Sequence, residues 1–190
     1  SIEFSFHGKT AHAAIAPDQG RSALDACELM SVGVNYLREH IRQDVRIHYV
    51  YLDAGKAPNI VPDYARVWYY IRCKDGDVLR DTTQRVRDIA RGAALMTGTQ
   101  AKEKVLSRGT ETRLNPSLIA LLYAAMQETP MPEYTEQELE FALELRKSLQ
   151  LPSVNAPYSR DILAPNSPVC VLAGSTDLSN VSQIVPTAFI

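Results

Sequence analysis

Cysteine is scarce in this chain, and the few cysteines lie far apart. Cys27, Cys73 and Cys170 are odd in number and form no Cys-x-x-Cys pair. This pattern indicates neither a disulfide framework nor a thiolate metal site. It is typical of a reducing, intracellular compartment, and we therefore expect a cytoplasmic protein.

Long apolar runs and long blocks of one charge are also missing. No segment approaches the roughly 18 apolar residues of a membrane span, and the first residues lack the features of a signal peptide. The 20 basic and 22 acidic residues are interspersed and leave a formal net charge of -2. This balance argues against a nucleic-acid or membrane partner. We expect a small molecule or another protein instead.

Short-spaced metal ligands are a third absence. Hydrolytic zinc sites need about three or four His, Cys or carboxylate ligands, and a closely spaced pair commonly anchors them. The sequence contains no His-x-Asp, no His-x-x-x-His and no Glu-Glu pair beside a buried strand. We therefore expect no metal site within these residues.

The patterns that are present predict a mixed α+β domain. The 190 residues, 45% of them apolar, suffice for one core and part of a second. Their periodicity predicts, in chain order, a strand at residues 2–6, a helix at 22–41, strands at 45–52 and 65–73, a helix at 78–96 and a strand at 100–107. This order is the ferredoxin-like plan, with a four-stranded antiparallel sheet and two helices on one face. Residues 1–107 thus form one predicted domain.

Residues 108–190 show a different pattern of predicted elements. Helix N-terminal signals occur at Asn115 and Thr135, and proline and asparagine predict a long loop at 151–168. The apolar run at 169–173 predicts a strand buried on both faces. One strand and two helices do not close a sheet, so we expect an incomplete α/β segment. The chain does not begin with Met, and we expect it to be part of a longer protein.

His12 is the first candidate functional residue. It lies in a Gly-Lys-Thr-Ala-His segment between a predicted strand and a helix. A loop histidine can donate a hydrogen bond to a developing oxyanion or to a substrate carboxylate. A polar turn residue at the surface explains it equally well. His7, His40 and His48 fit ordinary strand and helix-end positions.

Three further places offer polar groups. Asn59 lies between two prolines, where its amide can both donate and accept, although Asn is also a common turn residue. Arg72 ends a predicted strand and can bind a carboxylate, or form an ion pair at the sheet edge. Because these residues belong to neighbouring elements, we expect them to lie near His12. Asp177 follows the strand at 169–173 and can line a pocket there, or cap a helix or turn.

Three segments together resemble a known family. They read GKTAHAAIAPDQGRSALDA from Gly8, APNIVPDYARVWYYIR from Ala57, and GSTDLSNVSQIVPT from Gly174. They are similar to the metal-dependent aminoacylase and carboxypeptidase superfamily of amidohydrolases, and within it to the aminobenzoyl-glutamate hydrolase branch. The likeness runs through nearly the whole chain.

The resemblance implies a lid domain that interrupts a two-metal catalytic domain and mediates homodimerisation. It implies that His12 reaches into the partner subunit's active site to polarise the scissile carbonyl, and that Asn59 and Arg72 hold the substrate's carboxylate. It further implies a pocket lining made of Gly174, Ser175, Thr176 and Asp177. The resemblance also implies two divalent metals, zinc or manganese, and a substrate with an amide bond to an amino acid. Their ligands are expected outside this chain, which should then be inactive alone.

Two other hypotheses remain open from the residues. The first is a non-catalytic ferredoxin-like module that dimerises or binds a small ligand, for instance by pairing the edge strand at 45–52, with Tyr49 and Tyr51 on one face. The second is RNA binding through the aromatic run at residues 67–70. The net charge and the absence of an Arg/Lys-Gly-Phe run disfavour RNA.

Overall fold

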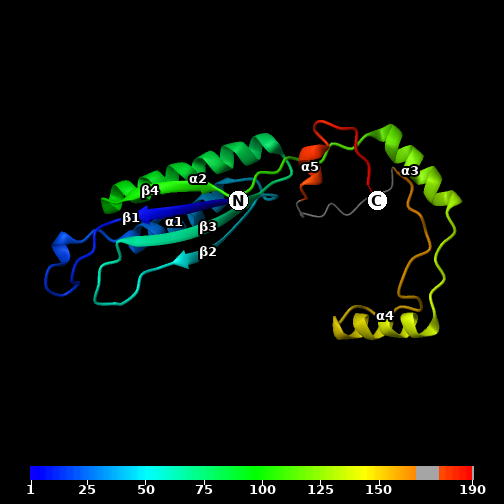
Figure 1. Cartoon of the computed structure of the whole chain (residues 1–190), viewed down its shortest axis with the longest axis horizontal. Helices are drawn as coiled ribbons and strands as arrows, with labels where there is room; N and C mark the ends of the chain where they lie inside the picture. Colours follow the sequence, from blue (N-terminus) through cyan, green and yellow to red (C-terminus); the bar gives the residue numbers. More distant parts are fainter. Residues whose placement is uncertain (166–175, 190) are drawn as a thin grey trace. The chain divides into compact units, whose positions relative to one another are not determined.

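Alternating burial along the strands builds a four-stranded antiparallel sheet. The computed structural model describes residues 1–165 and 176–189, so the strand predicted at 169–173 lies outside the described residues. The strands are β1 (Ile2–His7), β2 (Arg46–Asp53), β3 (Tyr64–Arg72) and β4 (Gln100–Val105). Their order is β2-β3-β1-β4, and every neighbouring pair is antiparallel (Figure 1). β2 is therefore an edge strand.

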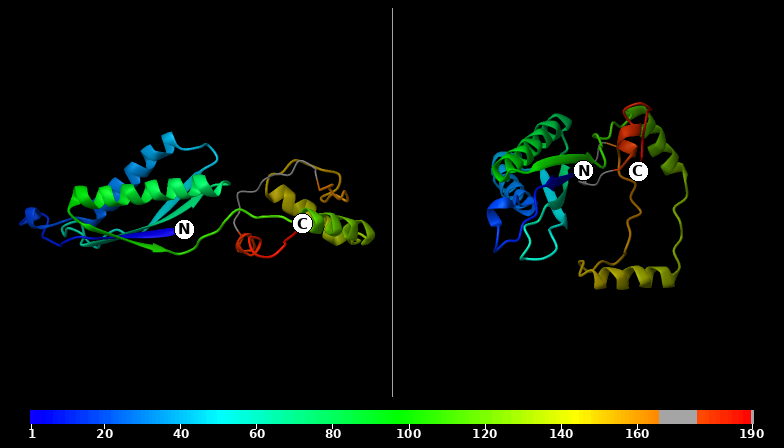
Figure 2. Two further views of the ribbon diagram at one scale, coloured as in Figure 1. Left: turned by 90° about the horizontal axis from the view of Figure 1, so that it is seen from above. Right: turned by 60° about the vertical axis from the view of Figure 1, so that its left-hand side comes forward.

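Two helices, α1 (Ala23–Leu37) and α2 (Gly76–Thr97), cover one face of this sheet (Figure 2). Every second strand residue faces the helices, so that Phe4, Phe6 and Val67 share one buried core with Met30 of α1 and Val86 of α2. The element order and the sheet topology confirm the predicted ferredoxin-like α+β fold.

The first helix is shorter than its apolar pattern predicts. α1 begins after the N-cap Ser22, whose Oγ accepts the Asp25 N–H at 3.1 Å. It ends at Leu37, a short 3-10 turn follows over Arg38–His40, and Ile41 is extended with φ -126° and ψ 164°. Arg38 donates to the Ile47 carbonyl of β2 at 2.7 Å, which holds the turn against the sheet. The prediction that the helix continues to residue 41 is wrong, although Ile41 still packs against the core.

The second helix is longer at its start than its pattern predicts. Asp75 is the N-cap, and its Oδ1 accepts the N–H groups of Asp77 at 2.9 Å and Val78 at 3.1 Å. Gly98 ends the helix in the left-handed region, with φ 64°, as a glycine after a helix commonly does. The predicted end of α2 is thereby confirmed.

Two amphipathic helices follow, α3 (Pro116–Glu128) and α4 (Glu136–Ser148), and neither contains a buried residue. Asn115 caps α3 by accepting the Leu118 N–H at 3.0 Å, and Thr135 with Glu138 forms the predicted capping box of α4. Hydrogen bonds from Thr135 lower the pKa of Glu138. Residues 151–165 form no helix or strand, as expected for this part of the long loop.

The chain divides into two compact units. Among the described residues, these are 1–111 with 176–180, and 112–165 with 181–189. The last described residues, 176–189, form what we call the returning segment. It contains a short helix, α5 (Leu178–Val181). In the described part of the chain, no helix has the length and apolar character needed to cross a membrane.

Candidate functional site

Two loops at one end of the sheet are joined by backbone hydrogen bonds into a single projection, which we call the His12 platform (residues 8–21 and 57–63). Ala13 N–H donates to the Asn59 carbonyl at 3.0 Å, and Val61 N–H donates to the Ala11 carbonyl at 2.9 Å. Lys9 and Arg21 exchange two further bonds, of 2.9 Å and 2.8 Å, within the first loop. His12 is therefore carried by a hydrogen-bonded scaffold rather than by an isolated loop.

Close backbone approach explains the glycines of this platform. A Cβ atom on Gly8 would lie 1.9 Å from the Arg21 carbonyl oxygen, which no other residue could tolerate without a backbone shift. Gly8 also donates its N–H to the Asp63 carbonyl at 2.8 Å. On the other side, a Cβ on Gly20 would lie 2.9 Å from the Val61 side chain. The two glycines allow the loops to meet.

His12 itself is exposed and has a defined ring orientation. Its Nδ1 accepts the Ala14 N–H at 3.2 Å, and its carbonyl accepts the Ala16 N–H at 3.0 Å. Because Nδ1 acts as an acceptor, the neutral imidazole carries its proton on Nε2. The arrangement can present an Nε2–H donor to an acceptor that approaches from outside the domain.

Asn59 lies in the same platform, at the third position of a turn. Ile60 N–H donates to the Ala57 carbonyl at 3.2 Å, and Pro58 occupies the second position, which favours proline. The Asn59 side chain is exposed, and its carbonyl anchors the residue after His12. The structure thus brings Asn59 and His12 together through their backbones.

Arg72 does not join them within one chain. His7, at the end of β1, pairs with Tyr64 at the start of β3, whereas Arg72 is the last residue of β3. Roughly 26 Å of extended strand separates Tyr64 from Arg72, at ~3.3 Å per residue. The Arg72 guanidinium lies over the Tyr70 ring at 5.1 Å. The expectation that Arg72 lies near His12 is therefore wrong for a single chain, because β3 runs away from the platform.

The returning segment contributes two described residues of the predicted pocket lining. Gly174 and Ser175 lie outside the described residues. Thr176 and Asp177 are exposed at the start of α5, where the Thr176 Oγ1 accepts the Leu178 N–H at 3.3 Å. The Asp177 carbonyl accepts the Asn180 N–H at 3.0 Å. These contacts are those of a helix start, the alternative considered for Asp177.

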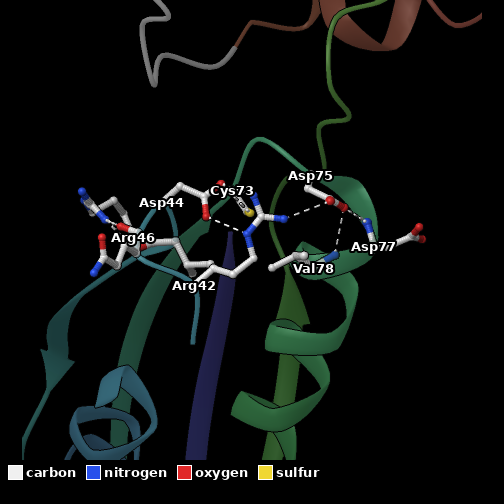
Figure 3. A network of polar contacts seen from close by, with 9 residues as sticks. Arg42, Asp44, Arg46, Cys73, Asp75, Asp77 and Val78 are labelled. Atoms are coloured by element: carbon white, nitrogen blue, oxygen red, sulfur yellow. Dashed lines mark hydrogen bonds and ion pairs between the residues drawn. The ribbon is translucent and has the colours of Figure 1, made fainter. Parts of the chain in front are cut away.

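A polar network at the far end of the sheet was missed by sequence reasoning (Figure 3). Arg42 donates to Asp44 through Nε and Nη2, each at 3.0 Å, and to Asp75 at 3.2 Å. The Asp44 carboxylate raises the pKa of Arg42, which therefore stays charged. Since Asp75 also caps α2, the network ties the loop before β2 to the start of this helix. The only local signal was Asp75 directly before Gly76, a favourable N-cap.

The described residues do not fit a metal ion. They contain no group of three or more His, Cys, Asp or Glu side chains that could hold one. Among these residues, His12 is not part of a group that a metal ion requires, and its chemistry is that of a hydrogen-bond donor.

Comparison with known proteins adds an independent line of evidence. Residues 1–96 match the family described as the peptidase dimerisation domain. The chain is 34% identical over 207 residues to a subunit of the p-aminobenzoyl-glutamate hydrolase of Escherichia coli, an alignment that covers 96% of this chain and 43% of that protein. It is 29% identical over 185 residues to the Xaa-Arg dipeptidase of Mus musculus, covering 97% of this chain and 36% of that protein.

Solved structures agree on the fold. An aminobenzoyl-glutamate utilization protein from Klebsiella pneumoniae superposes with a TM-score of 0.61 at 21% identity, covering 68% of this chain and 33% of the other. A putative amidohydrolase/peptidase from Burkholderia cenocepacia superposes with a TM-score of 0.55 at 22% identity, covering 67% and 32%. The chain spans less than half the length of the curated relatives it matches.

Proposed function

The chain belongs to the family of peptidase dimerisation domains, and from this premise we propose that it is the lid and dimerisation portion of a metal-dependent amidohydrolase. Residues 1–107 would be the lid, and residues 108–190 would belong to the catalytic domain. The whole enzyme would cleave an amide bond between an acyl group and an amino acid, such as the one in aminobenzoyl-glutamate. The family membership confirms the resemblance found in the sequence.

The observation that carries this proposal is the presentation of His12. Its Nδ1 is engaged by the Ala14 N–H, its ring is exposed, and the platform beneath it is held by backbone hydrogen bonds. A preorganised Nε2–H donor of this kind can stabilise the negative charge that develops on a carbonyl oxygen during amide cleavage. Because the ring is exposed and points an Nε2–H donor away from its own scaffold, we propose that it completes the active site of the partner subunit.

Asn59 and Arg72 are proposed to bind the carboxylate of the amino-acid half of the substrate. Both side chains can make the hydrogen bonds that a carboxylate accepts. One small substrate cannot reach both ends of β3, so His12 and Arg72 of the same subunit would serve different active sites. Gly174, Ser175, Thr176 and Asp177 are proposed to line the pocket from the catalytic domain.

The proposal implies partners for this chain. The enzyme would use two divalent metals, zinc or manganese, which must be bound by residues other than those described, because these contain no suitable cluster. It would form a homodimer through the lid, and the unpaired edge of β2 offers the backbone groups for such an association. The free thiols of Cys27 and Cys73 are in keeping with a cytoplasmic protein.

A complementation experiment tests the role of His12. In the complete protein that contains this chain, His12→Ala should lower turnover about 100- to 1,000-fold while bound metal, measured by elemental analysis, is unchanged. Mixing this variant with one that has lost its metal ligands should restore activity to about a quarter of the wild-type level. Half of the dimers are then mixed, and each has one complete site.

His40→Ala is the matched control, because His40 is an exposed histidine of the short 3-10 turn that follows α1, outside the platform. It should leave turnover unchanged. If His12→Ala turns over at the wild-type rate, the oxyanion role is wrong. If mixing restores nothing, His12 does not act across the dimer.

A second candidate is a dimerisation or small-ligand module without catalysis. The lack of a metal cluster among the described residues favours it for this chain taken alone. A complete, metal-supplied protein that dimerises yet hydrolyses no acylated amino acid would establish this alternative.

A further inference from the structure

We propose that Ile60 is a specificity-determining residue that contacts an apolar acyl group beside the carbonyl that His12 polarises. This inference rests on the proposed function, and it adds a residue and a substrate class to the same site.

His12 and Ile60 face each other across an antiparallel bridge. The hydrogen bonds that flank them run from Ala13 N–H to the Asn59 carbonyl and from Val61 N–H to the Ala11 carbonyl. This pattern defines a non-hydrogen-bonded pair, in which the Cα atoms approach to about 4.5 Å and both side chains stand on the same face. The Ile60 side chain therefore lies beside the imidazole.

The Ile60 side chain is exposed on a rigid support. Ile60 is 46% exposed although it belongs to a segment bonded on both sides. His12 and Ile60 are held in one scaffold, so an approaching ligand that accepts a hydrogen bond from His12 meets Ile60 in a fixed relation. Because neither residue has to be ordered when the substrate binds, this arrangement favours substrate affinity and turnover without a free-energy cost for ordering the loops.

The position of Ile60 indicates which half of the substrate it contacts. An Nε2–H donor lies about 2.9 Å from the carbonyl oxygen that it binds. A neighbouring side chain about 5 Å away then reaches the groups attached to the same carbonyl carbon. One of these groups is the amino-acid half, which carries a carboxylate that an isoleucine would leave without a partner. The other is the acyl group, and an apolar acyl group suits Ile60.

The test uses the complete enzyme and two substrates that share the amino acid, N-benzoyl-glutamate and N-acetyl-glutamate. Ile60→Thr keeps the β-branched shape and introduces one hydroxyl. We expect kcat/KM for the benzoyl substrate to fall about 10-fold more than kcat/KM for the acetyl substrate, in the range that apolar pocket contacts provide. Ile15→Thr is the matched control, since Ile15 is a 79% exposed isoleucine of the other platform loop and lies outside the bridge, and it should leave this ratio unchanged.

The possible outcomes distinguish an error in the role of Ile60 from an error in the proposed hydrolysis. Equal losses on both substrates, or no loss on either, overturn the role of Ile60 while the proposed hydrolysis stands. An equal shift in the Ile15→Thr control overturns it as well, because exposed apolar surface in general would then explain the effect. A wild-type enzyme that cleaves neither substrate overturns the proposed function and this inference with it.

Discussion

Replacing Gly8 by alanine should uncouple the His12 platform from the sheet. The added Cβ would lie 1.9 Å from the Arg21 carbonyl oxygen and 2.9 Å from its carbonyl carbon, and real Cβ atoms essentially never come closer than 3.0 Å. Both atoms are backbone, so the clash cannot be relieved by turning a side chain. The backbone at Gly8, directly after β1, and the Arg21 segment before α1 must move apart.

The cost follows from the bonds that this movement breaks. Gly8 N–H to the Asp63 carbonyl and the two bonds between Lys9 and Arg21 are the contacts at the clash. Three backbone hydrogen bonds at roughly 0.5–1.5 kcal/mol each correspond to a loss of about 1.5–4.5 kcal/mol in the free energy of unfolding. An overpacked site gives a similar figure, of about 1–3 kcal/mol.

Urea unfolding followed by circular dichroism would measure the loss, and amide hydrogen exchange would locate it. The amides of Lys9, Ala13 and Arg21 should exchange faster in Gly8→Ala. Gly92→Ala is the control, because a Cβ on Gly92 in α2 meets nothing within 4 Å and should stabilise the helix by about 0.5–1 kcal/mol. A Gly8→Ala protein with wild-type stability and unchanged exchange would refute the reasoning.

Three further predictions concern the helices and the cysteines. Asp75→Ala removes the N-cap of α2 and should lower the free energy of unfolding by about 1 kcal/mol in urea titrations, whereas Asp81→Ala, exposed on the same helix, should change it little. The lowered pKa of Glu138 means that its capping interaction is present above the carboxyl's ordinary pKa of 4.5 and is lost as the pH falls through the lower folded value. Helicity by circular dichroism should therefore drop on acidification, and Glu138→Gln should lose that step. Burial raises the pKa of Cys27 to about 12, so in a Cys170→Ser background at pH 8 a thiol reagent should label Cys73 well before Cys27, and equal rates would contradict this.

Local signals predicted most of the elements. The alternation in β1, the Asn115 cap and the Thr135 capping box each depend on residues within three or four positions of one another, and the structure contains all of them. The end of α1 was predicted wrongly because it depends on Arg38 reaching the Ile47 carbonyl, a contact with another element. The N-cap Asp75 was overlooked, although its place before Gly76 was a usable signal.

Some features of the candidate site also follow from local sequence, and others depend on contacts between distant segments. The sequence by itself determined the residue types, the ferredoxin-like order and the family, because motifs and periodicity are properties of neighbouring residues. Only the tertiary structure decided that the loops of His12 and Asn59 form one platform, that the imidazole presents Nε2, and that Ile60 stands beside it. It also placed Arg72 at the opposite end of β3 from the platform. The platform and the place of Ile60 arise from backbone pairing between segments about 50 residues apart in the sequence, and no local pattern specifies which carbonyl meets which N–H.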